Sequence, residues 1–287
     1  MPVTQDPSAL SDRAIGDIIR DTRNLTAEQV QSVLEHQRSH GLRFGEAAVA
    51  LGYVSTGDVM FALAQQFHYP YAAEDQGGHS AELVALNQPF SHEAEAFRAI
   101  RAQVMMRLFT GNAAPVALAV VSPERGDGKS YFAANLAITL AQLGGRTLLV
   151  DADMRHPRQH EIFKLSNEAG LSGILAGRAE NKVMQVFSPV PSLYVLPVGV
   201  VPPNPAELVE RQAFGLLMRE LATKFDHVIV DTPAASTGSD ASVIAARCGA
   251  AFMIGRKDAT PLAGMRELAD NLSVGATLLS GVIFNEY

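Results

Sequence analysis

The chain has 287 residues, of which 47% are hydrophobic and 18% are charged, and its net charge at pH 7 is −7. This composition supplies a buried core and excludes an intrinsically disordered protein. The acidic balance disfavours a general nucleic-acid binder, so we expect no nucleic acid among the partners. Cys248 is the only cysteine, which excludes an internal disulfide and favours a reducing compartment.

The sequence shows no signal-peptide pattern at its start. It also has no uninterrupted apolar run of the ~18–20 residues that span a bilayer. We therefore expect a cytoplasmic protein whose membrane association comes through a partner.

Residues 1–12 are polar and proline-bearing, which predicts a flexible tail. Residues 13–72 contain an internal repeat at one constant offset. The aligned pairs include Gly16 with Gly45, Val30 with Val59, Leu34 with Leu63 and Gln37 with Gln66. Each copy predicts a short helix, a turn, an N-cap residue (Thr26 or Ser55) and a second amphipathic helix. The sequence therefore predicts a small all-α tandem-repeat domain.

Residues 73–92 have no sustained period and are predicted to form a linker. A helical pattern resumes from Glu93 to Leu108, with Phe97 and Val104 on one face. This helix is either a solvated amphipathic helix or one that docks onto another subunit.

Apolar strands alternate with helices through the rest of the chain. The expected strands are Val116–Val121, Thr147–Val150, Leu193–Pro197, His227–Val230, Ala251–Ile254 and Leu278–Phe284. The expected helices include Ser130–Leu143, Pro205–Lys224, Ser239–Arg247 and Pro261–Leu272. Short, continuously apolar strands separated by helices predict an α/β, doubly wound, mainly parallel sheet with helices on both faces.

A glycine-rich loop, residues 122–130, joins the first of these strands to a helix. Its glycines let backbone N–H groups approach phosphate oxygens at the start of a helix. Lys129 adds a charge for phosphates and Ser130 a hydroxyl for Mg²⁺, although Pro123 stands where the strict pattern has glycine. The residues expected to bind the nucleotide are Gly126, Asp127, Gly128, Lys129, Ser130 and Tyr131.

Two other predicted strands run directly into carboxylates. Asp151 and Asp153 follow one of them, and Asp231 follows the other. Because ligands bind at the carboxyl ends of parallel strands, we expect these groups to converge on the glycine-rich loop. Carboxylates beside a phosphate-binding loop are suited to holding Mg²⁺ for phosphoryl transfer.

Five segments in order extend this pattern across the second domain, residues 93–287. They are Glu95–Arg101, Gly126–Ser130, Leu149–Pro157, Gly199–Leu208 and Val228–Pro233. On these segments the chain resembles the bacterial tyrosine kinases of exopolysaccharide export, which belong to the deviant-Walker P-loop ATPases. That family does not require the first glycine of the loop, which accommodates Pro123.

The resemblance implies an ATP- and Mg²⁺-dependent kinase with an integral-membrane chain-length determinant, or co-polymerase, as its activator. It places the protein at the inner face of a bacterial inner membrane. The implied catalytic residues are Lys129, Asp151, Asp153 and Asp231, with Asp151 as the base that activates the tyrosine hydroxyl. The implied metal residues are Ser130, Asp153 and Asp231. Glu95, Arg98 and Arg101 lie in the implied oligomerisation motif of a homo-oligomer.

The repeat domain has a second resemblance, to the N-terminal domain of type II secretion and pilus ATPases. Some tandem pairs of that motif bind cyclic di-GMP. The positions that match are Arg43, Gly45, Gly52 and Gln66. The first copy has Ala14 and Arg23 at two of the corresponding positions, so cyclic di-GMP binding and protein docking are both open.

Three functions compete. The favoured one is a protein-tyrosine autokinase that regulates exopolysaccharide chain length or export. Family members commonly carry a tyrosine-rich tail, whereas this sequence ends in the single Tyr287. That difference favours the second hypothesis, a partitioning-type ATPase switch without kinase activity. The third is a nucleotide-responsive scaffold that senses cyclic di-GMP.

Overall fold

The computed structural model describes residues 14–66, 80–109, 116–178 and 184–286. Its contacts divide the chain into two units, residues 1–78 and 79–287. The expected tail, the first part of the expected linker and Tyr287 lie outside the described residues.

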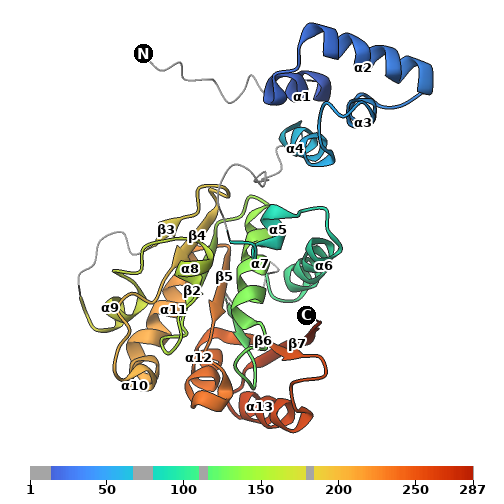
Figure 1. Ribbon diagram of the computed structural model, residues 1–287. Helices are drawn as coiled ribbons and strands as arrows, with labels where there is room; N and C mark the ends of the chain where they lie inside the picture. The colour runs from blue at the N-terminus through green and yellow to red at the C-terminus, as the bar shows by residue number, and fades with distance from the viewer. Residues whose placement is uncertain (1–13, 67–79, 110–115, 179–183, 287) are drawn as a thin grey trace. The chain divides into compact units, whose positions relative to one another are not determined.

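The first unit is helical (Figure 1). Its helices are α1 (Ile15–Arg23), α2 (Ala27–His40), α3 (Phe44–Ala50) and α4 (Thr56–Gln66). Thr26 and Gln29 form a capping box at the start of α2, and Ser55 and Asp58 exchange the same reciprocal bonds at the start of α4. The repeat in the sequence is thus a repeat of helix pairs, each second helix capped as its N-cap residue predicts.

Glycine has a packing role in this unit. A Cβ on Gly45 would lie 2.6 Å from Val59 Cγ1, so the close approach of α3 and α4 requires glycine there. Gly52 adopts a left-handed φ of +72°, which glycine adopts without steric cost.

The second unit is a seven-stranded sheet in the order β3-β4-β2-β5-β1-β6-β7. Among the described strands, only β3 and β4 pair in antiparallel fashion. The strands are β1 (Ala117–Val121), β2 (Thr147–Asp151), β3 (Gln185–Val186), β4 (Leu193–Leu196), β5 (His227–Asp231), β6 (Gly249–Arg256) and β7 (Leu278–Asn285). All six predicted strands are present, and the mainly parallel sheet is confirmed. The unpredicted β3 has only two residues.

Helices cover both faces of this sheet (Figure 1). On one face α7 (Lys129–Ala141) packs directly on β1, β2 and β5, and α5 (Val84–Asn87) and α6 (His92–Arg107) pack on α7. The other face carries α9 (Leu171–Leu175), α10 (Pro205–Glu210), α11 (Gln212–Lys224), α12 (Asp240–Cys248) and α13 (Leu262–Val274). Their apolar residues form one cluster with alternate residues of the strands.

Two predictions about elements differ from the structure. The single helix expected from Pro205 to Lys224 is broken at Arg211, whose ψ of 145° is extended. Residues 80–92, which the sequence assigns to a linker, belong to the second unit. The buried side chain of Asn135 on α7 accepts a hydrogen bond from Ala85 N (2.9 Å) and donates one to Glu82 O (2.8 Å). Such a long-range contact leaves no periodic signal in the segment itself.

Within the part of the chain that the structure describes, no helix combines the length and apolar character that crossing a bilayer requires.

Candidate active site

The glycine-rich loop connects β1 to α7 at the carboxyl edge of the sheet. Gly126 and Gly128 have φ values of +89° and +96°, which other L residues rarely adopt. Gly128 is the N-cap of α7, so the unsatisfied N–H groups of the first helical turn face the loop. This geometry suits an anion such as a nucleotide phosphate.

Asp127 braces the loop from inside. Its Oδ2 accepts a hydrogen bond from Glu124 N (2.9 Å), and its Oδ1 accepts one from Thr260 Oγ1 (2.6 Å). Asn285, at the end of β7, donates from Nδ2 to Asp127 O (2.8 Å). The loop is therefore tied to the segments that follow β6 and end β7.

Lys129 lies within the loop and is only 6% exposed. Its Nζ donates to Ser122 Oγ (2.9 Å) and to Glu124 O (3.3 Å). Burial lowers the pKa of this ammonium group, and the charges of Asp231 and Asp153 oppose that effect. A bound phosphate would add a further opposing charge, which favours the charged lysine.

The two strand-end carboxylates face each other across a strand pairing. Asp151 on β2 and Asp231 on β5 are register partners on adjacent strands, and both are completely buried. Asp153, two residues further along, is 8% exposed. The convergence expected from the sequence is therefore present.

Asp151 organises the loop that follows β2. Its Oδ1 accepts from Asp153 N (3.1 Å), and its Oδ2 accepts from Arg158 N (3.1 Å) and Gln159 N (3.0 Å). Asp153 Oδ1 in turn accepts from the backbone N–H groups of Arg155 (3.1 Å) and His156 (2.9 Å). Asp151 thus fixes the loop that carries Asp153, and Asp153 fixes the next turn of the same loop.

Burial has a large effect on this pair of acids. Desolvation, and secondarily the charge of Asp231, raises the pKa of Asp151 well above its ordinary value. Desolvation also raises the pKa of Asp231 to about 6, against the lowering effects of hydrogen bonds from Ser130 and Gln159 and of the Lys129 charge. A site of this kind binds a cation readily, because a cation relieves both the desolvation and the mutual repulsion.

A cavity of about 1030 Å³ opens beside the loop. The predicted site residues that line it are Gly126, Gly128, Lys129, Ser130, Tyr131 and Asp153. Residues of α6, of the end of β7 and of the loop after β2 also line it. Neither Asp151 nor Asp231 is among the lining residues, so Asp153 is the predicted carboxylate that lines the cavity.

The donor set fits Mg²⁺. Among the described residues no group of three or more histidine, cysteine or acidic side chains forms a metal cage. Mg²⁺ keeps several waters and uses only one or two carboxylates. Asp231 Oδ1 is a buried acceptor without a hydrogen-bond partner in the described structure. Such an oxygen can meet the ion or a water bound to it.

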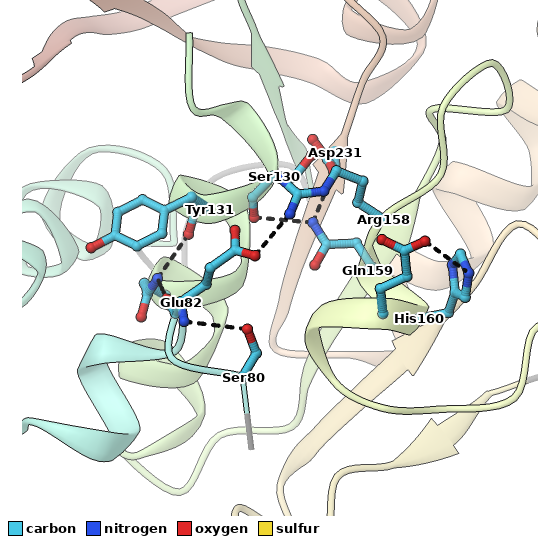
Figure 2. A network of polar contacts seen from close by, with 10 residues as sticks. Ser80, Glu82, Ser130, Tyr131, Arg158, Gln159, His160 and Asp231 are labelled. Carbon is cyan, nitrogen blue, oxygen red and sulfur yellow. Dashed lines mark hydrogen bonds and ion pairs between the residues drawn. The ribbon is translucent and has the colours of Figure 1, made fainter. Parts of the chain in front are cut away.

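The sequence analysis missed Gln159, the first residue of α8 (Gln159–Ile162). Its side-chain amide donates to Ser130 O (3.1 Å) and to Asp231 Oδ2 (2.8 Å), as Figure 2 shows. A glutamine after a proline-containing loop has no distinctive spacing, so no pattern in one sequence marks it. The guanidinium of Arg155, in the same loop, forms an ion pair with Asp240 within the second unit (2.7 Å).

The residues of the predicted oligomerisation motif are on α6. Arg98 pairs with Glu95 (2.7 Å), and Arg101 Nη1 donates to Thr139 O (2.9 Å) on α7. The apolar face of α6 packs inward, where Phe97 contacts the rings of Tyr131 and Phe132. Oligomerisation through this helix stays a prediction.

The residues matched to a cyclic di-GMP motif lie in the first unit. Arg43 is exposed at the start of α3, and Gln66 is the last residue of α4. Gly45 and Gly52 already have the packing and backbone roles described above. Arg43 and Gln66 are therefore the side chains through which ligand binding would be tested.

The fold and the site together define a P-loop nucleotide-binding protein of the α/β class. Among solved structures, the kinase domain of the Escherichia coli tyrosine kinase ETK matches with a TM-score of 0.67 and 30% identity, over 72% of this chain and 82% of that one. The Pyrococcus furiosus cell division ATPase MinD shares the fold, with a TM-score of 0.53 and 23% identity over 60% of this chain and 73% of that one.

Curated relatives narrow the class. CapB of Staphylococcus aureus is 37% identical over 163 residues, which is 57% of this chain and 71% of CapB. The tyrosine-protein kinase CpsD of Streptococcus agalactiae is 32% identical over 193 residues, 67% of this chain and 82% of CpsD. The chain belongs to the bacterial tyrosine-protein kinase family. The tyrosine-protein kinase Wzc of Salmonella typhimurium is 31% identical over 71% of this chain but only 28% of its own length. No family model matches.

Replacing Asp231 tests the electrostatics of the site. A carboxyl whose folded pKa is raised from 3.8 to about 6 destabilises the fold above the unfolded pKa, because the unfolded chain ionises first. Asp231→Asn should therefore raise the free energy of unfolding at pH 8 by about 1–3 kcal/mol, at about 1.4 kcal/mol for each pKa unit. The gain should shrink as the pH falls through 6 toward 4. Urea denaturation without nucleotide measures it.

The matched control is Asp270→Asn, because Asp270 is an exposed aspartate on α13. That change should alter stability by less than about 0.5 kcal/mol at either pH. An Asp231→Asn protein that is less stable than the wild type at pH 8 would contradict the assignment of a destabilising buried carboxyl.

Proposed function

We propose that this chain is an ATP- and Mg²⁺-dependent protein-tyrosine autokinase that also hydrolyses ATP and regulates exopolysaccharide chain length or export. The observation that carries the proposal is a cavity lined by Lys129, Ser130 and Asp153, with Asp151 and Asp231 buried at the adjoining strand ends, in a member of the tyrosine-kinase family. We further propose that it works as a homo-oligomer with a membrane-bound co-polymerase, at the inner face of the membrane.

Each residue has a proposed task. The N–H groups of the loop and Lys129 bind the phosphates and orient the transferred group. When bound, Mg²⁺ would offset the negative charge that develops on the phosphates. Ser130 and Asp231 would hold it, with Asp153 as a further oxygen donor.

The acceptor base can be Asp151 or Asp153. The family resemblance assigns this role to Asp151, and burial raises the pKa of its carboxyl, which is the direction that favours uptake of a proton. Geometry favours Asp153, because it lines the cavity whereas Asp151 is fully buried beneath the loop it organises. A tyrosine hydroxyl has an ordinary pKa near ~10, so in either case the carboxylate contributes mainly by positioning the hydroxyl.

Removal of the loop lysine tests the kinase directly. Lys129→Met keeps the length of the side chain and deletes its charge, so labelling of tyrosine by γ-labelled ATP and Mg²⁺ should fall at least about 100-fold. The assay contains the cytoplasmic segment of the co-polymerase as activator. Lys224→Met, at an exposed lysine on α11 paired with Glu220, should retain full labelling.

The same assay separates the two nucleotide-dependent hypotheses. Steady release of phosphate by the wild-type protein with no phosphotyrosine would overturn the kinase proposal and leave an ATPase switch. The same labelling assay on Asp153→Asn and on Asp151→Asn identifies the base. When both variants are assayed at equal occupancy by nucleotide, only loss of the true base should abolish transfer to tyrosine.

For the first unit we propose cyclic di-GMP sensing, supported by the exposed Arg43 at the start of the second helix pair. Calorimetry of the full chain with cyclic di-GMP should give saturable heat, and Arg43→Ala should abolish it because a phosphate or guanine partner is lost. Absence of heat in the wild type would leave protein docking as the role of this unit.

A further inference from the structure

Gln159 forms hydrogen bonds with three parts of the candidate site, although it lies in none of the sequence motifs. Its backbone N–H donates to Asp151 Oδ2 (3.0 Å). Its side-chain Nε2 donates to Ser130 O (3.1 Å) and to Asp231 Oδ2 (2.8 Å). The side chain is completely buried. One residue is thus hydrogen-bonded to the end of β2, the end of β5 and the first turn of α7. Figure 2 shows the two contacts of its side chain, with Ser130 and Asp231.

The orientation of this amide follows from its neighbours. Ser130 O is a backbone carbonyl oxygen and can only accept a hydrogen bond. Asp231 Oδ2 is likewise purely an acceptor when its carboxyl group is ionised. The amide nitrogen of Gln159 must therefore face both atoms, and its oxygen must face away. The amide also leaves the charge of the site unchanged. A lysine in its place would compete with a cation for Asp231, and a glutamate would add a fourth carboxylate.

Two acceptors are left over by this arrangement. Gln159 Oε1 and Asp231 Oδ1 are both buried and have no hydrogen-bond partner in the described structure. With Oδ2 of Asp231 engaged by the amide, Oδ1 is the oxygen that stays available. Water molecules bound to Mg²⁺ are strong donors and match such acceptors.

A neighbouring ion pair does not account for the role of Gln159. Arg158 Nη2 lies 2.8 Å from Glu82 Oε1, and the two side chains are 48% and 36% exposed. Exposed pairs of this kind contribute little to stability and are screened by salt. The buried amide of Gln159 and the side chain of Ser130 are therefore the hydrogen-bond partners that hold Asp231.

We propose that Gln159 is a positioning residue for Mg²⁺ in the nucleotide site, acting through the contact of its buried amide with Asp231 and Ser130. It fixes the rotamer of Asp231 and ties the end of β5 to the start of α7. This inference rests on the proposed nucleotide-binding function, and it goes beyond it by assigning metal dependence to a residue outside the phosphate loop and the strand-end aspartates.

The test measures binding and not turnover. In the full chain, Gln159→Met keeps the side-chain length and removes the amide. The affinity for ADP in EDTA should stay within about twofold of the wild type, because the phosphate loop is intact. In the presence of ADP, Mg²⁺ should raise the melting temperature. The Mg²⁺ concentration that gives half of this rise should be at least about tenfold higher in the variant, as for loss of a residue that orients a metal ligand.

Controls separate positioning from general damage. Gln185→Met, at a glutamine that donates to Ser166 O on another part of the unit, should leave the Mg²⁺ midpoint unchanged. In an Asp231→Asn background, Gln159→Met should add nothing further, since it acts through Asp231. If Gln159→Met does not fold, Gln159→Asn takes its place and should show the same rise, because the shortened amide cannot reach both partners.

Three results would overturn the proposal: an unchanged Mg²⁺ midpoint, an equal loss of ADP affinity in EDTA, or additivity with Asp231→Asn. If the wild type itself showed no Mg²⁺-dependent effect of ADP, the proposed function would fall as well. If the wild type showed the Mg²⁺-dependent effect of ADP and the Gln159 variant had the same Mg²⁺ midpoint, only the inference about Gln159 would be overturned.

Discussion

The structure depends on one electrostatic constraint, the burial of the Asp151 and Asp231 carboxyl groups opposite each other on adjacent strands. Both are fully shielded from solvent, and desolvation raises the pKa of each. Such an arrangement is unfavourable for a free protein and favourable once a cation is present. The chain tolerates it by supplying three backbone N–H groups to Asp151 and an amide to Asp231.

Several other contacts of the second unit hold the elements around this pair of aspartates in place. The glycine-rich loop places the ammonium group of Lys129 near the aspartates, and Asp127 joins the loop to Thr260 and Asn285. The segment before α6 is fixed to α7 through Asn135. The cavity is thereby bounded by elements that are far apart in the sequence and rigidly connected in the fold.

Much of this could be predicted from the sequence because the signals are local. Apolar strands, a glycine-rich turn and strand-end aspartates each occupy consecutive residues, and sheet geometry alone brings them to one edge. The repeat of helix pairs was likewise visible, and its capping residues Thr26 and Ser55 lie where the pattern puts them.

What could not be predicted depends on contacts between distant residues. Gln159 matters because it touches Ser130 and Asp231, and residues 80–92 are structured because Asn135 holds them. The burial of Asp151 away from the cavity also depends on tertiary contacts. In the sequence it follows a strand just as a ligand-facing carboxylate would, so the sequence alone does not distinguish the two cases. The different burial of the three aspartates, with only Asp153 lining the cavity, is therefore a structural observation.

The most direct test of this account is the titration of the aspartate carboxyls by ¹³C NMR in the protein labelled at aspartate. The free protein should show a carboxyl with a midpoint near 6 that disappears in Asp231→Asn. Addition of Mg²⁺ and ADP to the wild type should lower that midpoint by more than about one pH unit, because the ionised form is then paired with a cation. Aspartates that all titrate near their ordinary value of ~3.9 in the free protein would contradict the buried, strained pair on which the site is built.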